Sequence, residues 1–439
     1  MTASSQKSDP LKGVVRAPGD KSISHRSLIL GAMANGTTTI SGLLEGADIM
    51  STADAMRAFG AEVTKTSNGN WQVLGQNIWK KPIRNVDCGN AGTGVRLIMG
   101  AASGYDMTAQ FTGDESLSSR PMARVTRPLE KMGVKLTCSN GDRLPIELHS
   151  NGQLSALEYE SPKASAQVKS CILLAGVNSV GETVVIEKPT RDHTENMLRA
   201  FGCPVRTERL SDGRNRVSVN RSQSDIKQGL VATHVDVPGD PSSAAFPIVA
   251  ALITPGSDIT VENVMMNPTR TGLLETLVEM GANLTTSNER VSGGELIADI
   301  RVQYSQLYGI TVPSERAASM IDEYPILAVA ASQAKGVTHM PGIHELRVKE
   351  SDRIAATEAL LSINGVKVSS TQDSLTVTES SVKGGGTVTT HHDHRIAMSA
   401  LILGLVAKKA VSVDDASMIA TSFPSFFDLM SSLGAKISS

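Results

Sequence analysis

One local pattern recurs six times along the chain: an apolar-periodic helix, a glycine, a small residue and then the start of a strand. A glycine suits this place because a helix C-cap needs a left-handed backbone. The copies follow one another at similar intervals, and six copies of one supersecondary unit predict a repeat architecture. The glycines of the pattern are Gly60, Gly133, Gly202, Gly281, Gly365 and Gly434.

Each repeat also has an earlier helix that begins just after a turn, in stretches such as GDKSIS, GNAGTGVR and HHDHRIAM. A short strand rich in Thr, Val and Ile follows, as in TTTISGL and SDITVENV. The unit is therefore predicted to be β-α-β-α-β with one further strand. The similar stretches PGDKS and PGDPS begin at Pro18 and Pro238, and the second of these lies near the middle of the chain. We expect an α/β fold of two lobes, three units each, with a cleft between them.

The composition excludes several classes of protein. The 439 residues carry a net charge of −2 and only 3% aromatic side chains, so neither a basic field nor stacking platforms for nucleic acid are expected. No apolar signal segment opens the chain, and runs such as 396–407 are too short to span a bilayer. Cys88, Cys138, Cys171 and Cys203 form no CxxC pair and are interpreted as buried free thiols. We expect a cytoplasmic enzyme without nucleic-acid or membrane partners.

Cations gather at several expected helix starts. Lys21 and Arg26 lie in PGDKSISHRS, Arg96 follows the Gly-rich stretch GNAGTG, and Arg395 lies in DHRIAM. A helix N-terminus already carries partial positive charge, so cations there are unfavourable unless an anion joins them. Singly, each is interpreted as a solvated surface charge. Together they predict a cleft for a ligand with several negative charges, although GNAGTG is neither a P-loop nor a GxGxxG fingerprint.

Two carboxylates stand among these cations. Asp322 precedes an apolar helix in SMIDEYPILAVAA, and Glu350 lies in RVKESDR between Lys349 and Arg353. The spacing alone is compatible with a helix cap for Asp322 and an ion pair for Glu350. The functional interpretation is proton transfer by two carboxylates in a cationic cleft. The stretch HHDHR at 391–395 has poor spacing for a metal site on a helix, and no HExxH motif or cysteine pair completes one.

These motifs together resemble the EPSP synthases, the 5-enolpyruvylshikimate-3-phosphate synthases of the shikimate pathway. The resemblance implies a two-lobed inverse α/β barrel of six β-α-β-α-β-β repeats, three per lobe. Residues 17–237 would form one lobe, and residues 1–16 plus 238–439 the other, with the active site in the cleft between them. The matching stretches span almost the whole chain in the family's order: PGDKSISHR, GNAGTGVR, SSRPM, KASAQVKS, PTRDHTENM, SMIDEYPILAVAA, LRVKESDR and DHRIAMS.

The implied reaction moves the enolpyruvyl group of phosphoenolpyruvate to the 5-hydroxyl of shikimate 3-phosphate and releases phosphate, with no metal or organic cofactor. Asp322 looks like the base for the attacking hydroxyl, Glu350 like the acid that protonates the methylene, and Lys21 like a third catalytic residue. The residues implied for shikimate 3-phosphate are Lys21, Ser22, Arg26, Ser165, Ala166, Gln167, Arg191, Asp322 and Lys349. Those implied for phosphoenolpyruvate are Lys21, Asn90, Gly92, Arg120, Gln167, Arg353 and Arg395.

The chain departs from the family's pattern at two places. Thr421 stands where many members have Lys, so one phosphoenolpyruvate contact is missing or supplied elsewhere. Ser165-Ala166-Gln167 replaces a Ser-Ser-Gln run. Both features resemble the class II subgroup, whose naturally glyphosate-insensitive members carry Ala at the position of Gly92. An added methyl group would crowd glyphosate, so glyphosate is expected to inhibit this chain more strongly than those members. The enzyme is also expected to be a monomer.

Three other functions compete with this interpretation. The sister enzyme that acts on UDP-N-acetylglucosamine shares the fold but typically uses a cysteine in a mobile loop, and SLSSRPM contains none. A non-catalytic sensor of phosphorylated metabolites on the same scaffold would not need Asp322 and Glu350. A metal-dependent phosphatase would have to be built on HHDHR.

Overall fold

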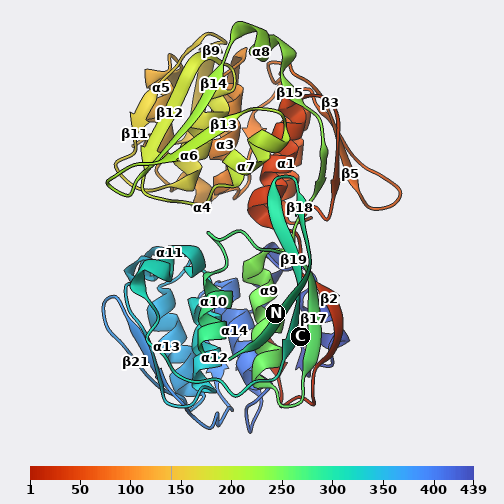
Figure 1. Cartoon of the computed structure of the whole chain (residues 1–439), viewed down its shortest axis with the longest axis vertical. Coiled ribbons are helices and arrows are strands. Elements are labelled where there is room, and N and C mark those ends of the chain that lie inside the picture. The colour runs from red at the N-terminus through yellow and green to blue at the C-terminus, as the bar shows by residue number, and fades with distance from the viewer. Residues whose placement is uncertain (140) are drawn as a thin grey trace. The chain divides into compact units, whose positions relative to one another are not determined.

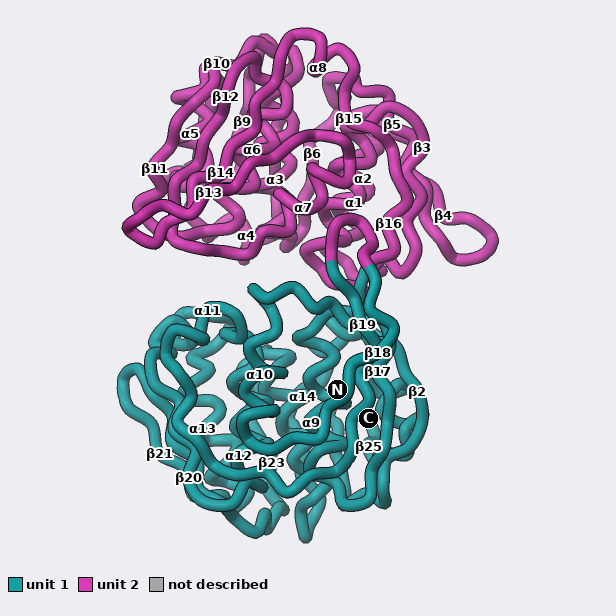
Figure 2. The backbone as a smooth tube through the Cα atoms, viewed as in Figure 1, with its two compact units in different colours: residues 1–18, 238–290, 296–439 teal, residues 19–237, 291–295 magenta. Residues whose placement is uncertain are grey.

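The computed structural model describes residues 1–139 and 141–439. The chain divides into two compact units, coloured separately in Figure 2. Unit 2 comprises residues 19–237 and 291–295, and unit 1 comprises residues 1–18, 238–290 and 296–439. Each unit is a layered α/β structure with three sheets among its described residues.

The three sheets of unit 2 share one plan: a parallel outer strand, then the strand after the first helix, then the last strand, then the strand after the second helix. The first sheet contains β3 (Ala34–Ser41), β4 (Glu62–Lys65), β5 (Trp71–Gln76), β15 (Leu230–Val231) and β16 (His234–Asp236). The second contains β6 (Val86–Asp87), β7 (Asp106–Thr112), β8 (Lys135–Ser139) and β9 (Arg143–Asn151). The third contains β10 (Leu154–Ser155), β11 (Glu158–Glu160), β12 (Ser179–Glu187), β13 (Val205–Arg209) and β14 (Asn215–Arg221).

The first helix of each unit 2 repeat forms the core of the unit. Helix α3 packs against both α1 and α6, and nearly every residue of these three helices is buried. A helix that is largely apolar all round belongs in the interior, which explains their content of buried Leu, Ile, Val and Ala. The helices of unit 2 are α1 (Lys21–Met33), α2 (Ala47–Ala58), α3 (Gly92–Ala102), α4 (Glu115–Ser118), α5 (Ala123–Lys131), α6 (Ala166–Gly176), α7 (His193–Ala200) and α8 (Gln223–Gln228).

Unit 1 repeats the plan. Its first sheet contains β2 (Lys12–Arg16), β17 (Asp258–Met265), β18 (Asn283–Ser292) and β19 (Glu295–Gln303). The second contains β20 (Val337–Met340), β21 (Lys367–Ser370) and β22 (Leu375–Thr378). The third contains β1 (Ala3–Ser5), β23 (Thr387–Val388), β24 (Val411–Val413) and β25 (Ile437–Ser438).

Three buried helices again form the core, since α9, α12 and α14 pack against one another. The helices of unit 1 are α9 (Pro241–Ile253), α10 (Gly272–Glu279), α11 (Ala317–Met320), α12 (Tyr324–Ser332), α13 (Arg353–Ile363), α14 (His394–Gly404) and α15 (Phe426–Ser432). Short 3₁₀ turns lie at η1 (Ser314–Arg316), η2 (His344–Val348) and η3 (Ser417–Thr421). No described helix is long and apolar enough to cross a membrane.

The six glycines of the repeat all adopt the backbone that was predicted for them. Their φ angles range from +78° at Gly202 to +103° at Gly133, and each follows the second helix of its repeat. A residue with a Cβ is strained in this region, so glycine is required there. The predicted α/β repeat is confirmed in each unit.

The N-terminal strand belongs to the last repeat. Strand β1 pairs antiparallel with both β24 and β25, with Ala3 opposite Val413 and Ser4 opposite Ser438. Figure 1 marks the two ends of the chain on neighbouring parts of unit 1. The first residues therefore supply the strand that completes the sixth sheet.

The tip of the β18–β19 hairpin is grouped with unit 2, although both strands belong to a unit 1 sheet. The Ser292 hydroxyl accepts a hydrogen bond of 3.0 Å from the Asp236 backbone N–H. Gly294 has φ +87°, and a Cβ there would lie 2.4 Å from the Asn196 carbonyl oxygen. Only glycine fits this close approach, so the tip packs as part of unit 2.

Candidate active site

The predicted site residues fall into two sets, one in each unit, and each set is described by itself. In unit 2, helix α1 begins after Asp20, whose carboxylate accepts the Ile23 N–H at 2.8 Å as an N-cap. Lys21 follows and pairs with Asp48 at 2.5 Å. Its side chain is 41% exposed, so the ammonium also faces solvent and can meet a ligand.

Arg26 is buried and is held in place by three hydrogen bonds. Its Nε donates to Thr194 at 2.7 Å, Nη2 donates to Ser170 at 2.8 Å, and Nη1 donates to the Ser22 carbonyl at 2.9 Å. Burial lowers the pKa of this guanidinium to about 10, although Glu195 and Asp20 oppose the shift. These bonds use three of the five N–H donors of the guanidinium.

A second cationic group surrounds the start of α3. Arg120 donates to the Asn90 side chain at 2.7 Å, and Arg96 donates to Gln167 at 2.7 Å and to the Gly92 carbonyl at 3.1 Å. Burial, together with the positive charges of Arg124 and Arg120, lowers the pKa of Arg96 to about 10. Neither Arg96 nor Arg120 pairs with a carboxylate of the described residues. The group is therefore a site of uncompensated positive charge, which an anion would neutralise.

The start of α6 contributes the next predicted residues. The Ser165 hydroxyl caps the helix, accepting the Val168 N–H at 3.5 Å, and Ala166 is the first helical residue. The Gln167 amide donates to Thr93 at 2.9 Å, which links α6 to α3. Arg191 lies half-buried in the loop before α7, and its positive charge contributes to lowering the pKa of Arg26. The predicted residues of unit 2 thus gather around the N-terminal ends of α1, α3, α6 and α7.

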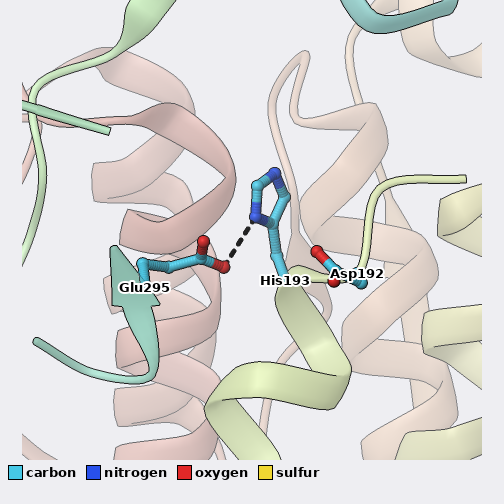
Figure 3. A group of neighbouring side chains, drawn as sticks. All are labelled: Asp192, His193 and Glu295. Carbon is cyan, nitrogen blue, oxygen red and sulfur yellow. Dashed lines mark hydrogen bonds and ion pairs between the residues drawn. The ribbon is translucent and has the colours of Figure 1, made fainter. Parts of the chain in front are cut away.

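A histidine and two carboxylates lie close together at the start of α7 (Figure 3). His193 Nδ1 lies 2.8 Å from Glu295 Oε1, and both side chains are buried. Two ligands of one zinc ion would be about 3.3 Å apart, given bonds of about 2.0–2.1 Å at a tetrahedral angle. The shorter separation is that of a hydrogen bond, so His193 and Glu295 form a contact between α7 and the hairpin tip.

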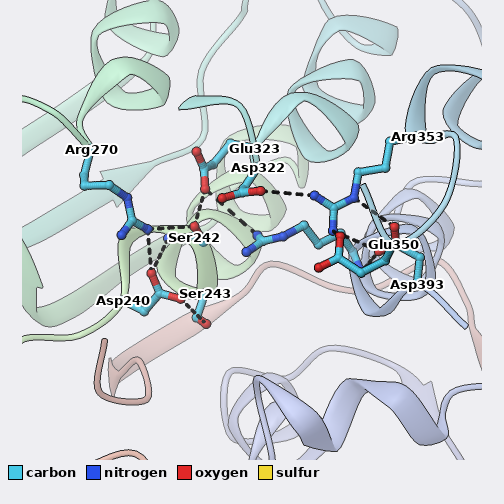
Figure 4. Close-up of polar contacts among 10 residues, drawn as sticks. Asp240, Ser242, Ser243, Arg270, Asp322, Glu323, Glu350, Arg353 and Asp393 are labelled. Atoms are coloured by element: carbon cyan, nitrogen blue, oxygen red, sulfur yellow. Dashed lines mark hydrogen bonds and ion pairs between the residues drawn. The ribbon is translucent and has the colours of Figure 1, made fainter. Parts of the chain in front are cut away.

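In unit 1, Arg353 organises the predicted catalytic carboxylates (Figure 4). Its Nη1 donates to Asp322 at 3.1 Å, Nη2 donates to Glu350 at 2.5 Å, and Nε donates to Asp393 at 2.8 Å. Burial opposes the charge of Arg353, but these three carboxylates outweigh it and raise the pKa of the guanidinium. Asp322 and Glu350 are therefore held on one buried cation.

The remaining predicted residues of unit 1 surround this cluster. Glu350 is 53% exposed and Lys349 half-buried, so both face solvent. Arg395 Nη1 lies 3.9 Å from the buried Glu323, which also accepts a hydrogen bond from Ser242. Burial, and then the charge of Asp322, raises the pKa of Glu323. Arg395 is thus less tightly paired than Arg353.

The stretch HHDHR forms the start of a helix. Asp393 caps α14 by accepting the Arg395 N–H at 2.9 Å, and it also accepts from Arg353 and from the Ser351 hydroxyl. His392 is 81% exposed in a left-handed conformation, so its side chain lies on the surface. The role of Asp393 as the buried partner of Arg353 was not predicted.

Sequence reasoning missed a buried charge cluster in unit 2. Lys169 lies 3.1 Å from Glu187 and 2.6 Å from Glu195, and all three side chains are at most 2% exposed. A cavity of about 530 Å³ was also unforeseen, in unit 1 between α10 and the β18–β19 strands. Its lining includes Leu274, Val278 and Leu284 and none of the predicted site residues.

Comparison with known proteins identifies the family. Residues 5–430 match the family described as EPSP synthase (3-phosphoshikimate 1-carboxyvinyltransferase). The chain belongs to the EPSP synthase family. A 3-phosphoshikimate 1-carboxyvinyltransferase of Caulobacter vibrioides is 57% identical over 430 residues, which cover 97% of this chain and 96% of that protein. One of Pseudomonas sp. (strain PG2982) is 52% identical and covers 99% and 97% of the two chains.

The structure agrees with this membership. An EPSP synthase structure from Acinetobacter baumannii superposes with a TM-score of 0.93 at 42% identity, and covers 100% of this chain and 99% of that one. The predicted fold and the predicted enolpyruvyl transferase activity of the shikimate pathway are thereby confirmed. The alternative functions are not favoured by these matches. The subgroup and the role of each site residue remain predictions.

Proposed function

We propose that this EPSP synthase family member transfers the enolpyruvyl group of phosphoenolpyruvate to the 5-hydroxyl of shikimate 3-phosphate, releasing phosphate on the route to chorismate and the aromatic amino acids. The observation that carries the residue assignment is the pairing of Asp322 and Glu350 on the single guanidinium of Arg353. Proton transfer needs both a base and an acid near the reacting atoms, and this arrangement supplies two carboxylates.

Shikimate 3-phosphate is assigned to the helix starts of unit 2. Ser22 and Arg26 on α1, the Ser165–Gln167 run at α6, and Arg191 before α7 offer hydroxyl, amide and guanidinium donors. Helix N-termini and guanidinium groups suit phosphate and carboxylate oxygens. Lys349 and Asp322 of unit 1 would complete the set.

Phosphoenolpyruvate is assigned to residues of both units, most of them cations. Lys21, Asn90, Gly92, Arg120 and Gln167 would bind it from unit 2. Arg353 and Arg395 would bind it from unit 1. This division supports an active site formed where the two lobes, residues 17–237 and residues 1–16 plus 238–439, meet around the substrates. Excluding water from such a site would strengthen every ionic contact within it.

The reaction proceeds by addition and elimination. Asp322 takes the proton of the 5-hydroxyl while the oxygen of that hydroxyl bonds to C2 of phosphoenolpyruvate. Glu350 donates a proton to the methylene carbon. The product of this step is a tetrahedral ketal that carries a new methyl group. Loss of one methyl proton then restores the double bond as the C–O bond to phosphate breaks. Glu350 and Lys21 are the candidate groups for the proton transfers of this second step.

The test is phosphate release with phosphoenolpyruvate and shikimate 3-phosphate, with UDP-N-acetylglucosamine as the control acceptor. We expect release only with shikimate 3-phosphate, and a loss of about 10²- to 10⁴-fold in kcat for Asp322→Ala or Glu350→Ala, the range for a general acid or base. A folded protein that binds shikimate 3-phosphate but releases no phosphate would instead be a sensor.

Three further properties belong to the same proposal. The enzyme acts in the cytoplasm, as a monomer, and is inhibited by glyphosate at the phosphoenolpyruvate site. The class II subgroup is supported by Thr421 and by Ala166, the two departures from the commoner pattern.

A further inference from the structure

The first turn of α7 follows Arg191 in the chain and contacts three other elements through buried side chains. His193 contacts Glu295 of the hairpin tip. Thr194 accepts from Arg26 on α1 and shares a hydrogen bond of 2.6 Å with Ser170 on α6. The next residue, Glu195, pairs with Lys169, also on α6. The loop that carries Arg191 is therefore anchored immediately on its C-terminal side.

Glu187 anchors the same loop on its N-terminal side. It is the last residue of β12 and is 1% exposed. Its Oε2 accepts the Ser165 N–H at 3.1 Å, and its Oε1 accepts from the Thr190 hydroxyl and lies 3.1 Å from the Lys169 ammonium. One carboxylate therefore ties the start of α6 to the residue preceding Arg191.

Lys169 holds this carboxylate in place, because its ammonium lies 3.1 Å from Glu187 Oε1. Burial opposes the charge of Lys169, but the carboxylates of Glu195 and Glu187 outweigh it and raise the pKa of the ammonium. Buried ions need partners, and here one cation serves a carboxylate from each of two elements. A buried ion pair adds little net stability compared with apolar packing, so its value lies in fixing the positions of the groups around it.

We propose that Glu187 is a positioning residue for shikimate 3-phosphate, because it fixes the Ser165 segment and the Arg191 loop relative to each other. The inference rests on the proposed function, which assigns both segments to that substrate. Glu187 itself need not touch the substrate, since its carboxylate oxygens are already occupied by Ser165, Thr190 and Lys169.

The experiment compares Glu187→Gln with Glu182→Gln. Glutamine at position 187 keeps the shape of the side chain but loses its charge. Its amide N–H groups would face the donors that Glu187 now accepts from. Glu182 lies on the same strand but is exposed and pairs with Arg216, which makes it a matched control. Shikimate 3-phosphate affinity is measured by calorimetric titration without phosphoenolpyruvate, and KM for each substrate by phosphate release.

We expect Glu187→Gln to weaken shikimate 3-phosphate binding by about tenfold or more, the range for a lost charged hydrogen bond. The KM for phosphoenolpyruvate should rise less, because Gln167 is the one residue of these two segments that is also assigned to that substrate. Lys169→Met should behave in the same way, and Lys169→Arg should recover part of the affinity because it restores the cation.

Unchanged shikimate 3-phosphate affinity in Glu187→Gln, or equal losses for both substrates, would overturn the inference. If Glu187→Gln does not fold, Thr190→Val removes one hydrogen bond alone, and the same split between substrates is expected of it. An unaltered enzyme that fails to bind shikimate 3-phosphate would overturn the proposed function and this inference together. If the unaltered enzyme binds shikimate 3-phosphate and only the variants lose affinity, the proposed function stands and the inference is supported.

Discussion

At the scale of single residues, Gly92 determines how much room lies beside Arg120. A Cβ at this position would lie 2.9 Å from Arg120 Nη1 and 3.4 Å from Arg96 Nη1. Both neighbours are ends of long side chains, so the methyl group of alanine would displace a guanidinium rather than the backbone. The site would therefore become narrower without losing a charge.

Gly92→Ala should raise the inhibition constant for glyphosate by about ten- to a hundredfold. Overpacking of this kind costs about 1–3 kcal/mol, and glyphosate, which we propose binds in place of phosphoenolpyruvate, is the longer molecule. The KM for phosphoenolpyruvate should rise less. Steady-state inhibition of both forms checks this, and equal inhibition constants would contradict it.

His25 predicts a pH dependence of stability. Burial first, then the charges of Lys21 and Arg26, lowers its pKa well below the ordinary 6.5, while Asp20 opposes the shift. The unfolded chain therefore binds a proton that the folded chain rejects. The stability contribution of His25 is complete above about pH 6.5 and is lost as the pH falls through that value towards the folded pKa.

His25→Asn keeps a side chain able to hydrogen-bond with Thr52, the partner of His25 Nδ1 at 2.8 Å, but does not titrate. The free energy of unfolding in urea, determined above and below the ordinary histidine pKa, gives the measurement. The original protein should lose more stability than the variant as the pH falls over this interval. An equal loss in both would show that His25 titrates normally.

At the scale of elements, the hairpin tip 291–295 is held on unit 2 by two kinds of contact. Gly294 fits against the backbone of Asn196, with the Ser292–Asp236 hydrogen bond beside it, and Glu295 accepts from His193. The backbone contact depends on shape, whereas the second contact depends on a buried carboxylate. The two can therefore be separated by mutation.

Glu295→Gln should loosen the tip without unfolding β18 and β19, because a neutral amide makes a weaker hydrogen bond than a carboxylate does. Amide hydrogen exchange should become faster at residues 291–295 and at the first turn of α7. The arms of the hairpin should keep their protection. Unchanged exchange at the tip would show that it is held without the charge of Glu295.

Some elements could be predicted from the sequence and others could not, for a physical reason. The helix ends at Gly60 and Gly434 depend on local backbone preference, so nearby residues reveal them. The partners of Lys169 lie on β12 and α7, and nothing in the local pattern around this lysine distinguishes a buried side chain from an exposed one. The role of Asp393 was missed for the same reason, since its partner Arg353 lies on another helix, far away in the sequence.

At the scale of the whole molecule, the two units are built differently from the chain. All of unit 2 except the short segment 291–295 comes from one continuous stretch, residues 19–237. Unit 1 is assembled from three stretches, and its last sheet needs β1 from one end of the sequence and β25 from the other. Contacts within unit 1 therefore span greater sequence separations than contacts within unit 2 do.

This pairing has a consequence on the ribosome. Unit 2 can fold almost completely as soon as residue 237 has emerged, because domains fold as units during synthesis. Strand β1 is made before unit 2 but has to wait for β24 and β25, which follow unit 2 in the sequence. A nascent chain should therefore expose β1 unpaired until β24 and β25 have been made, and chaperones that bind nascent chains could bind this segment during that time.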